Sequence, residues 1–382
     1  MRYYWMRYGP CQVYASKRMN GSGNPADQRV LRGRGATMNP ANRFVQIHLE
    51  RDPDFDPAED LAPGTQVYKD ETASIISYND SPDVGFSASV NPYRGCEHGC
   101  IYCYARPTHE YLGFSAGLDF ETKIMVKEKA PDLLRKELSS RKWKPQTLAI
   151  SGITDCYQPI ERKFKITRQC LEVLAEFRNP VSLITKNFLI TRDIDILQQL
   201  ARFNAAAAFV SITSLDASLQ QKMEPRTSLP QARLSAVQKL HDAGIPVGIM
   251  CAPMIPGLND HEMPAILDAA VKAGAQYAGY VPVRLPFAVK DLFERWLEAH
   301  FPDRKDKVLG RIRSMRGGKL NDPNFGSRMS GEGPFADQMA SLFAVAARKA
   351  GIADRRLDLS VDSFRVPAST ISQTQKMFPF CS

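Results

Sequence analysis

The stretch NPYRGCEHGCIYCYARPTHEY, from Asn91 to Tyr111, carries the pattern that decides how this chain folds and what it binds. Its cysteines, Cys96, Cys100 and Cys103, have the spacing C-x3-C-x2-C and follow a predicted strand directly. A cubane iron-sulfur cluster is normally held by four thiolates, so three from one compact loop leave one iron without a protein ligand. An open coordination position is where a metal site binds a substrate or cofactor. We therefore interpret this loop as the holder of a 4Fe-4S cluster.

Two other interpretations of the same residues stay open. A zinc site completed by His98 or His109 would use the same cysteines, and core cysteines can also take this spacing by chance. The zinc interpretation leads to a different class of function, a non-catalytic metal-binding module. Iron content after anaerobic reconstitution separates it from an enzyme.

Composition and cysteine number are typical of an intracellular globular enzyme. The 382 residues are 43% hydrophobic and 24% charged, which is near the globular average. Eight cysteines are too few for a disulfide scaffold in a chain of this length. The N-terminus lacks the apolar stretch of a secretory signal, and no apolar run is long enough to span a membrane. We expect a protein of the reducing cytoplasm that does not insert into a membrane.

Basic residues gather in two places. The net charge is +9, and residues 1–43 carry eight Lys or Arg against Asp27, whereas residues 50–71 are acidic. A second cluster consists of Arg304, Lys305, Lys307, Arg311, Arg313, Arg316 and Lys319. Such clusters neutralise phosphates in DNA or RNA, although a solvated helical face has the same composition. The clusters make DNA or RNA a candidate partner.

Short apolar runs alternate with amphipathic helical patterns over the middle of the chain. This alternation predicts a parallel sheet of the α/β class, and six strands indicate a partial (β/α)6 barrel of the TIM type. The predicted strands are 86–90, 147–151, 181–185, 207–213, 246–250 and 277–281. The predicted helices are 130–138, 167–177, 193–203, 229–243, 260–273, 290–300, 305–315 and 335–350.

Four regions follow from these patterns. Residues 1–45 are a basic, loosely ordered N-terminal arm, of which RGRGATMNPANRF, residues 32–44, could lie extended across a folded surface. Residues 46–80 form an acidic linker with one or two short strands. Residues 81–286 form the barrel, and residues 287–382 form a helical C-terminal extension.

The cysteine motif resembles the signature of the radical SAM superfamily. Together with the segments TDCYQPIE and MEPR, it resembles the branch of spore photoproduct lyase-like proteins, also called DNA repair photolyase-like. The resemblance covers residues 74–284 well. It implies that the open iron binds S-adenosylmethionine, which is reductively cleaved to a 5′-deoxyadenosyl radical that abstracts hydrogen from a substrate. It also implies an electron donor of the flavodoxin or ferredoxin type.

The resemblance assigns the cofactor site to residues at the carboxyl ends of the strands, where parallel barrels bind ligands. SGITD at the end of the second strand takes the place of the glycine-rich motif that meets the cofactor's amino group. Lys186, Ser211 and Thr213 correspond to contacts with ribose and carboxylate, and Arg226 matches an arginine that clamps the carboxylate. Tyr102 and the turn MIPGLN resemble the adenine-binding elements. The remaining assigned positions are Gly152, Thr154, Asp155, Ile255, Pro256 and Gly257.

Candidates for a role in the radical step are Cys156, Tyr102 and Tyr104. The lyase-like branch is expected to have a hydrogen-donating cysteine at the end of the second strand, where this chain has Gly152. Cys156 is the nearest thiol, and a buried packing role for it is at least as favoured. Reversal of a thymine dimer is therefore in doubt, and a peptide or small metabolite is the alternative substrate to nucleic acid.

Overall fold

The computed structural model describes residues 31–44, 64–352 and 357–368. Its centre is a seven-stranded sheet with the order β10-β9-β8-β7-β6-β3-β2. All neighbours from β3 to β10 are parallel, and β2 pairs antiparallel with β3 at the edge. The strands are β2 (Ile76–Tyr78), β3 (Ala88–Val90), β6 (Leu148–Ile150), β7 (Val181–Thr185), β8 (Ala206–Ser211), β9 (Val247–Met254) and β10 (Tyr277–Pro282).

The six parallel strands are the six that the sequence predicts, which confirms the partial α/β barrel. β7 has the predicted bounds, whereas β9 continues to Met254 rather than ending at residue 250. The central strands β6, β7 and β8 are mostly buried, as expected for parallel strands that are covered on both faces, whereas β10 at the edge of the sheet is partly exposed. Their carboxyl ends together form the opening of the barrel, which we call the barrel mouth.

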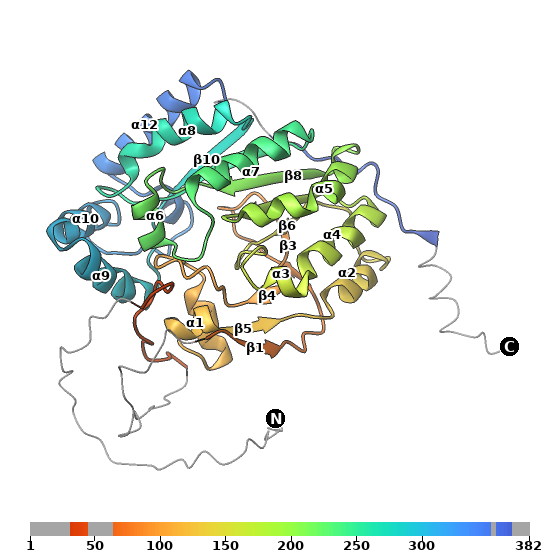
Figure 1. Cartoon of the computed structure of the whole chain (residues 1–382), viewed down its shortest axis with the longest axis horizontal. Helices are drawn as coiled ribbons and strands as arrows, with labels where there is room; N and C mark the ends of the chain where they lie inside the picture. The colour runs from red at the N-terminus through yellow and green to blue at the C-terminus, as the bar shows by residue number, and fades with distance from the viewer. Residues whose placement is uncertain (1–30, 45–63, 353–356, 369–382) are drawn as a thin grey trace, which may run out of the picture.

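Helices between the strands cover the outer face of the sheet (Figure 1). They are α2 (Ala130–Leu138), α4 (Ile166–Phe177), α5 (Ile194–Ala201), α7 (Pro230–Asp242) and α8 (Met263–Lys272). Each turns an apolar stripe inward, and the buried side chains of strands and helices form the main core. No helix within the described ranges combines the length and the apolarity that crossing a bilayer requires.

A small second sheet lies beside the barrel, with the order β1-β5-β4. The sequence predicts strands in its linker region but not β4 and β5. The strands are β1 (Gln66–Lys69), β4 (Tyr93–Arg94) and β5 (Lys123–Val126). The acidic residues of the predicted linker before position 64 lie outside the described residues. Further short elements are η1 (Arg106–Leu112), α1 (Leu118–Thr122), α3 (Glu161–Phe164), η2 (Phe188–Asp193), α6 (Ala217–Met223) and η3 (Asp260–Glu262).

The C-terminal extension is helical between residues 289 and 349, and this part packs against the segment that carries the cysteines. Its helices are α9 (Val289–His300), α10 (Pro302–Ser314), α11 (Ser327–Ser330) and α12 (Pro334–Lys349). Residues 353–356 and 369–382 of the predicted extension lie outside the described residues. A second core joins apolar residues of α9 and α10 to Cys100, Ile101 and Tyr102. The indole Nε1 of Trp296 in α9 also donates to the carbonyl of Lys222 in α6, at 3.0 Å. The extension is therefore part of the wall behind the cysteines.

Residues 31–44, which we call the strap, cross the surface beside α1 (Figure 1). The backbone N–H groups of Gly35 and Ala36 donate to the carboxylate of Glu121, at 3.1 and 2.8 Å. Farther along, Arg43 forms an ion pair with Glu110 at 2.6 Å. The strap contains no helix or strand, in line with its turn chemistry. Residues 1–30, the rest of the predicted arm, lie outside the described residues.

Candidate active site

The cysteine loop, residues 96–103, connects β4 to η1. Its backbone is anchored from two directions, because Cys96 N–H donates to the carbonyl of Phe120 at 2.8 Å and Ile101 N–H donates to that of Met223 at 3.0 Å. Gly99 within the loop has φ 67, and a Cβ there would lie 2.7 Å from Oε2 of Glu121. Glycine is required at this position because the backbone is left-handed and the space is filled.

Three free thiols project from this loop. Cys96 and Cys100 are buried, and Cys103 is partly buried. Burial raises the pKa of each thiol, so a thiolate here needs a positive charge beside it, which iron ions supply. In the described part of the chain, no three His, Cys, Asp or Glu side chains converge on the position of a single metal ion. A cubane gives each thiolate its own iron, and the donor set of three thiolates fits such a cluster with one open corner.

The two histidines of the zinc interpretation have other surroundings. His98 is buried, with Nδ1 at 3.4 Å from Oδ2 of Asp155 and Nε2 at 3.2 Å from the side-chain nitrogen of Asn187. His109 lies between the rings of Phe114 and Phe120, with centroid distances of 5.3 and 5.6 Å. Both imidazoles are thus placed by neighbours that are not cysteines.

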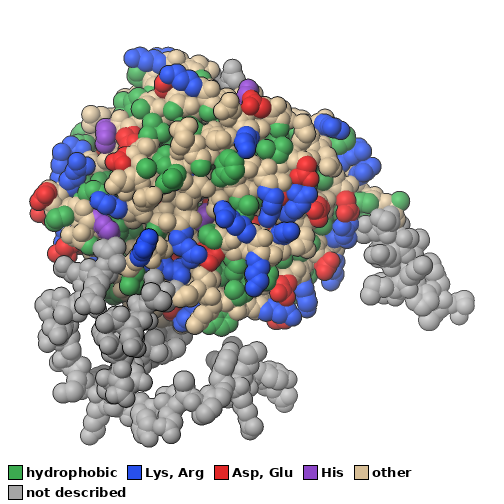
Figure 2. Space-filling view, in the orientation of Figure 1, with side chains coloured by type: hydrophobic (Ala, Val, Ile, Leu, Met, Phe, Trp, Pro, Cys, Tyr) green, Lys and Arg blue, Asp and Glu red, His purple; other side chains and the backbone are tan. Residues whose placement is uncertain are grey.

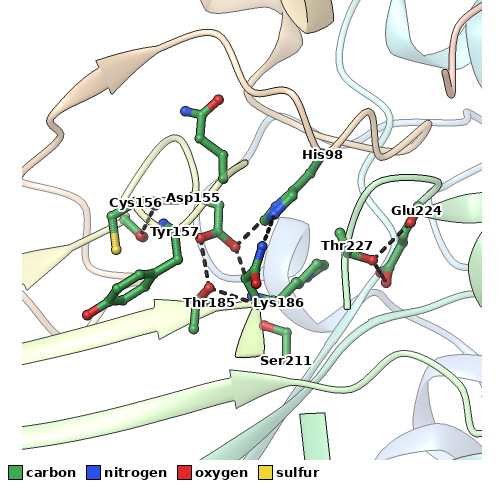
Figure 3. A network of polar contacts seen from close by, with 12 residues as sticks. His98, Asp155, Cys156, Tyr157, Thr185, Lys186, Ser211, Glu224 and Thr227 are labelled. Atoms are coloured by element: carbon green, nitrogen blue, oxygen red, sulfur yellow. Dashed lines mark hydrogen bonds and ion pairs between the residues drawn. The ribbon is translucent and has the colours of Figure 1, made fainter. Parts of the chain in front are cut away.

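Asp155 links the cysteine loop to the barrel mouth. Its carboxylate accepts the hydroxyl of Thr185 and the backbone N–H of Lys186, both at 2.8 Å, and it faces His98 (Figure 3). Burial would raise the pKa of Asp155, but the charge and hydrogen bond of His98, with two backbone N–H groups, lower it to about 2. Asp155 is therefore ionised at neutral pH and ties the end of β6 to the end of β7.

Glu224 forms a second buried polar centre on the other side of the loop. Its carboxylate accepts the hydroxyl of Tyr102, the guanidinium of Arg233 and, at 2.9 Å, the hydroxyl of Thr213. Burial opposes ionisation, but the charges of Arg233 and Lys186 outweigh it and lower the pKa of Glu224. Tyr102 is thereby locked between two cysteines of the loop. Sequence reasoning missed Glu224, although it stands in the segment MEPR that drew attention to Arg226.

Comparison with known proteins decides the family. The model described as the Radical SAM superfamily matches residues 90–270. An uncharacterized protein of Mycobacterium tuberculosis (strain ATCC 25618 / H37Rv) is 34% identical over 243 residues, which are 63% of this chain and 70% of that protein. The chain belongs to the radical SAM superfamily. Radical SAM enzymes use a 4Fe-4S cluster, which the cysteine loop predicts, and S-adenosylmethionine, which the family resemblance implies.

Other relatives are more distant. An uncharacterized protein of Methanocaldococcus jannaschii is 30% identical over 173 residues, covering 45% of this chain and 62% of that protein. A Pseudomonas phage M6 protein named Radical SAM Nalpha-GlyT isomerase is 24% identical over 180 residues, covering 46% of this chain and 35% of that protein. Spore photoproduct lyase, solved with a dinucleoside spore photoproduct, aligns with a TM-score of 0.55 at 16% identity over 75% of this chain and 79% of that chain. At this identity the likeness shows the fold.

The other residues that the resemblance assigns to the cofactor lie around the barrel mouth. Ser211 is buried at the end of β8, and Lys186 follows β7, with Nζ donating to the carbonyl of Ala252 at 3.2 Å. Thr154 is buried, and its hydroxyl donates to the carbonyl of Tyr93 at 2.9 Å, so it ties the segment after β6 to β4. Gly152 follows β6, where an added Cβ would lie 3.4 Å from Phe86. The structure gathers these residues at one end of the sheet.

Arg226, the expected carboxylate clamp, is partly exposed and faces Glu97 of the cysteine loop. Its Nη1 lies 3.4 Å from Oε1 of Glu97 and 3.4 Å from the hydroxyl of Thr65. Its backbone N–H donates to the carbonyl of His98 at 3.3 Å. Arg226 thus touches the cysteine loop both through its side chain and through its backbone.

The expected adenine-binding turn follows β9. Ile255 is buried, and its N–H donates to the side chain of Asn259 at 2.6 Å. Gly257 has φ 86, and its N–H donates to Asp260 at 2.9 Å. Pro256 and Gly257 also line a pocket of about 620 Å³ on the side of the turn that faces α10 and α12.

The three candidates for the radical step occupy different environments. Tyr102 is buried against Glu224, whereas Tyr104 is 48% exposed and its hydroxyl donates to the carbonyl of Gly152 at 2.7 Å. Cys156 is fully buried in the main core, and its N–H donates to the hydroxyl of Ser151. Burial raises the pKa of Cys156 well above its ordinary value. Of the three side chains, that of Tyr104 is the one open to solvent.

Proposed function

We propose that this chain is a radical SAM enzyme that abstracts hydrogen from a nucleic-acid substrate, with a reductant of the flavodoxin or ferredoxin type as its electron donor. The observation that carries the chemistry is the loop of three free cysteines, backed by the match of residues 90–270 to the radical SAM family. When bound, the cluster and S-adenosylmethionine supply a 5′-deoxyadenosyl radical. A protein that keeps such thiols and such a cluster needs a reducing compartment, and we propose the cytoplasm.

The residues of the chain have distinct tasks in this proposal. Cys96, Cys100 and Cys103 hold the cluster, while Asp155 and Glu224 fix the loop against the strand ends. Lys186, Ser211 and Arg226 are the polar groups placed to bind the cofactor's ribose and carboxylate. The remaining cofactor contacts that we propose are those of Tyr102, Gly152, Thr154, Asp155, Thr213, Ile255, Pro256 and Gly257. Buried polar residues that are fully hydrogen-bonded give such a site its fixed geometry.

Support for nucleic acid comes from the surface of α10. Arg304, Lys307 and Arg311 line the pocket of about 620 Å³ together with the apolar side chains of Phe335 and Met339. Figure 2 shows Lys and Arg side chains at the left edge of the molecule, where Figure 1 places α10. Cations beside apolar side chains suit a phosphate chain that carries flat bases. Spore photoproduct lyase, which shares the fold, was solved with a dinucleoside ligand.

Three members of the same basic cluster have partners within the protein. Nη1 of Arg311 lies 3.9 Å from Oδ2 of Asp260, which lines the same pocket. Lys305 pairs with Glu294 and Glu298 of α9, at 3.7 and 3.6 Å. Arg316 is buried and donates to two backbone carbonyls. The cluster is thus split between a solvent-facing set and a structural set, and the nucleic-acid proposal depends on the former.

We do not extend the proposal to thymine-dimer reversal by a thiol donor. Gly152 stands where the lyase-like branch is expected to have its cysteine, and Cys156 has no exposed surface. A thiol that is sealed in the main core cannot reach a substrate at the barrel mouth. Tyr104 is the exposed group nearest the cluster in sequence, and we propose it as the side chain that meets the substrate.

Anaerobic reconstitution tests the proposal. Wild-type protein is expected to bind about four irons and to release 5′-deoxyadenosine with dithionite and S-adenosylmethionine. Cys100→Ala should lose both properties, whereas Cys170→Ala, which removes a buried core thiol, should keep them. Zinc in place of iron, or cofactor cleavage by Cys100→Ala, would refute the ligand assignment. Deuterium transfer into 5′-deoxyadenosine from labelled oligonucleotides, peptides or metabolites then identifies the substrate class.

Salt dependence tests the nucleic-acid part. Binding of a single-stranded oligonucleotide should weaken steeply with salt, and the double variant Arg304→Gln, Lys307→Gln should lower the slope of log K against log salt by about one to two. The control is Arg141→Gln, Lys142→Gln, which removes two exposed cations after α2, at the other side of the molecule (Figure 1). Equal slopes for both double variants would point to a peptide or metabolite substrate.

A further inference from the structure

Arg284 lies at the barrel mouth, two positions after the end of β10. Its guanidinium carbon is 5.5 Å from the ring centroid of Tyr104, and Nη1 is 3.3 Å from the sulfur of Met329. The buried Nε has no hydrogen-bond partner, and Arg284 forms no ion pair with a carboxylate of the described residues. Burial and the neighbouring charge of Arg328 lower its pKa. The charge of Asp83 acts on Arg284 in the opposite sense, but that carboxylate is paired with Arg328, so the half-buried guanidinium has no counter-charge of its own among the described residues.

The two arginines beside it are satisfied. Arg328 forms an ion pair with Asp83 and donates to the hydroxyl of Ser81 at 2.7 Å. Arg316 donates to the carbonyls of Ser327 and Val283, at 2.7 and 3.2 Å. Within the described residues, Arg284 is therefore the member of this trio whose charge is left for a group from outside the protein.

An aromatic surface lies next to this charge. Tyr104 directly follows the ligand Cys103, and its hydrogen bond to the carbonyl of Gly152 fixes the ring across the mouth from β6 toward β10. The ring is 48% exposed, and Ile153 beside Gly152 is 42% exposed. An exposed, oriented aromatic ring beside a free arginine is the combination that binds a base together with its phosphate.

We propose that Arg284 and Tyr104 bind one nucleotide of the substrate strand, with its phosphate on the guanidinium and its base against the exposed part of the ring. The inference rests on the proposed nucleic-acid function and names where the reacting nucleotide sits. The last cluster ligand is adjacent to Tyr104 in the chain, so this placement brings the nucleotide to the cofactor end of the barrel.

The experiment is fluorescence anisotropy of a fluorescein-labelled oligothymidylate with the reconstituted holoenzyme over a range of salt. Arg284→Gln should weaken binding about tenfold or more and reduce the salt slope by about one. Arg284→Lys keeps the charge but not the bidentate fork, so it should keep the slope with weaker binding. Tyr104→Phe keeps the ring but loses the hydrogen bond that orients it, so it should weaken binding less than Tyr104→Ala, which should weaken binding about tenfold. Arg141→Gln is the matched control and should change nothing.

Each result bears on the inference in one direction. Wild-type slope and affinity in Arg284→Gln would overturn it while leaving the nucleic-acid function in place. No binding by wild-type protein that still releases 5′-deoxyadenosine would remove the nucleic-acid function and this site together. A urea midpoint for Arg284→Lys equal to that of wild type separates lost binding from lost folding.

Discussion

Replacing Gly35 by alanine should detach the strap from the cysteine loop. A Cβ on Gly35 would lie 1.7 Å from the carbonyl oxygen of Gly99 and 2.9 Å from its carbon. Both atoms are backbone, so no side chain can rotate away to make room. The strap must retreat by about 1.5 Å to restore ordinary contact distances.

That retreat breaks the anchor on Glu121. The N–H groups of Gly35 and Ala36 now donate to its carboxylate at 3.1 and 2.8 Å, and a shift of this size takes both beyond hydrogen-bond range. Hydrogen bonds to a charged group contribute about 1.5–3 kcal/mol each, so we expect a loss of about 3–6 kcal/mol. Glu121 keeps its buried ion pair with Arg106 at 2.5 Å, which limits the damage to the strap.

Urea unfolding and limited proteolysis measure this effect on the apoprotein, and iron retention in air measures it on the holoprotein. Gly35→Ala should unfold at lower urea, be cut within residues 31–44, and lose iron faster than wild type. Gly85→Ala is the control, because a Cβ there meets nothing within 4 Å and its φ is not positive. If the two variants behave alike in all three assays, the strap does not support the loop and the reasoning fails.

Four other variants test buried titratable or hydrogen-bonded side chains. Burial lowers the pKa of His109 to about 4, against about 6.5 in an unfolded chain. Between these pH values the unfolded state binds a proton that the folded state does not, so the free energy of unfolding falls as the pH drops from 6.5 to 4. In urea titrations at pH 7 and pH 4, His109→Leu should reduce the difference between the two free energies of unfolding by about 3 kcal/mol. An unchanged pH profile would count against a buried, neutral His109. Glu224→Gln leaves the guanidinium of Arg233 buried without a counter-charge and should lower the free energy of unfolding by about 3–5 kcal/mol. Tyr102→Phe removes one hydrogen bond to a charge and should lower it by about 1.5–3 kcal/mol. A larger loss for Tyr102→Phe than for Glu224→Gln in urea unfolding would contradict this network. Asp155→Asn should reduce iron bound per chain, because His98 in the cysteine loop loses its contact with the Asp155 carboxylate. Equal iron in Asp155→Asn and in the exposed control Asp132→Asn would argue against a link from β6 to the loop.

The parallel strands and the large helices could be predicted because their apolar residues repeat along the chain itself. α2 and β7 were placed to the residue, since each presents a clean apolar stripe or run. β1 has no such signal, because all four of its residues are exposed, and its pairing with β5 depends on residues more than fifty positions away. The helix α6 had a signal in Asp216, whose carboxylate caps the helix by accepting the N–H of Ser218, but the segment is short.

The residues of the candidate site likewise differ in whether they can be recognised from the sequence. The cysteines can be recognised from sequence because the ligands of one cluster stand within eight positions of each other. Glu224 could not, because what gives it meaning is a hydrogen bond from Tyr102, which is 122 positions away. Arg284 was likewise unremarkable in sequence, since its distinguishing property is a missing partner, and a missing partner is visible only when the neighbours are in place.

The shared core behind Tyr102 has a consequence for anyone who trims this chain to a minimal domain. The family match ends at residue 270, yet the apolar lining of the ligand segment comes from Val283, Phe293 and Ile312. A fragment cut at the family boundary would keep all three cysteines and still leave one flank of that segment bare to water. The segment that the catalytic unit of this protein needs is therefore longer than the segment that matches the family.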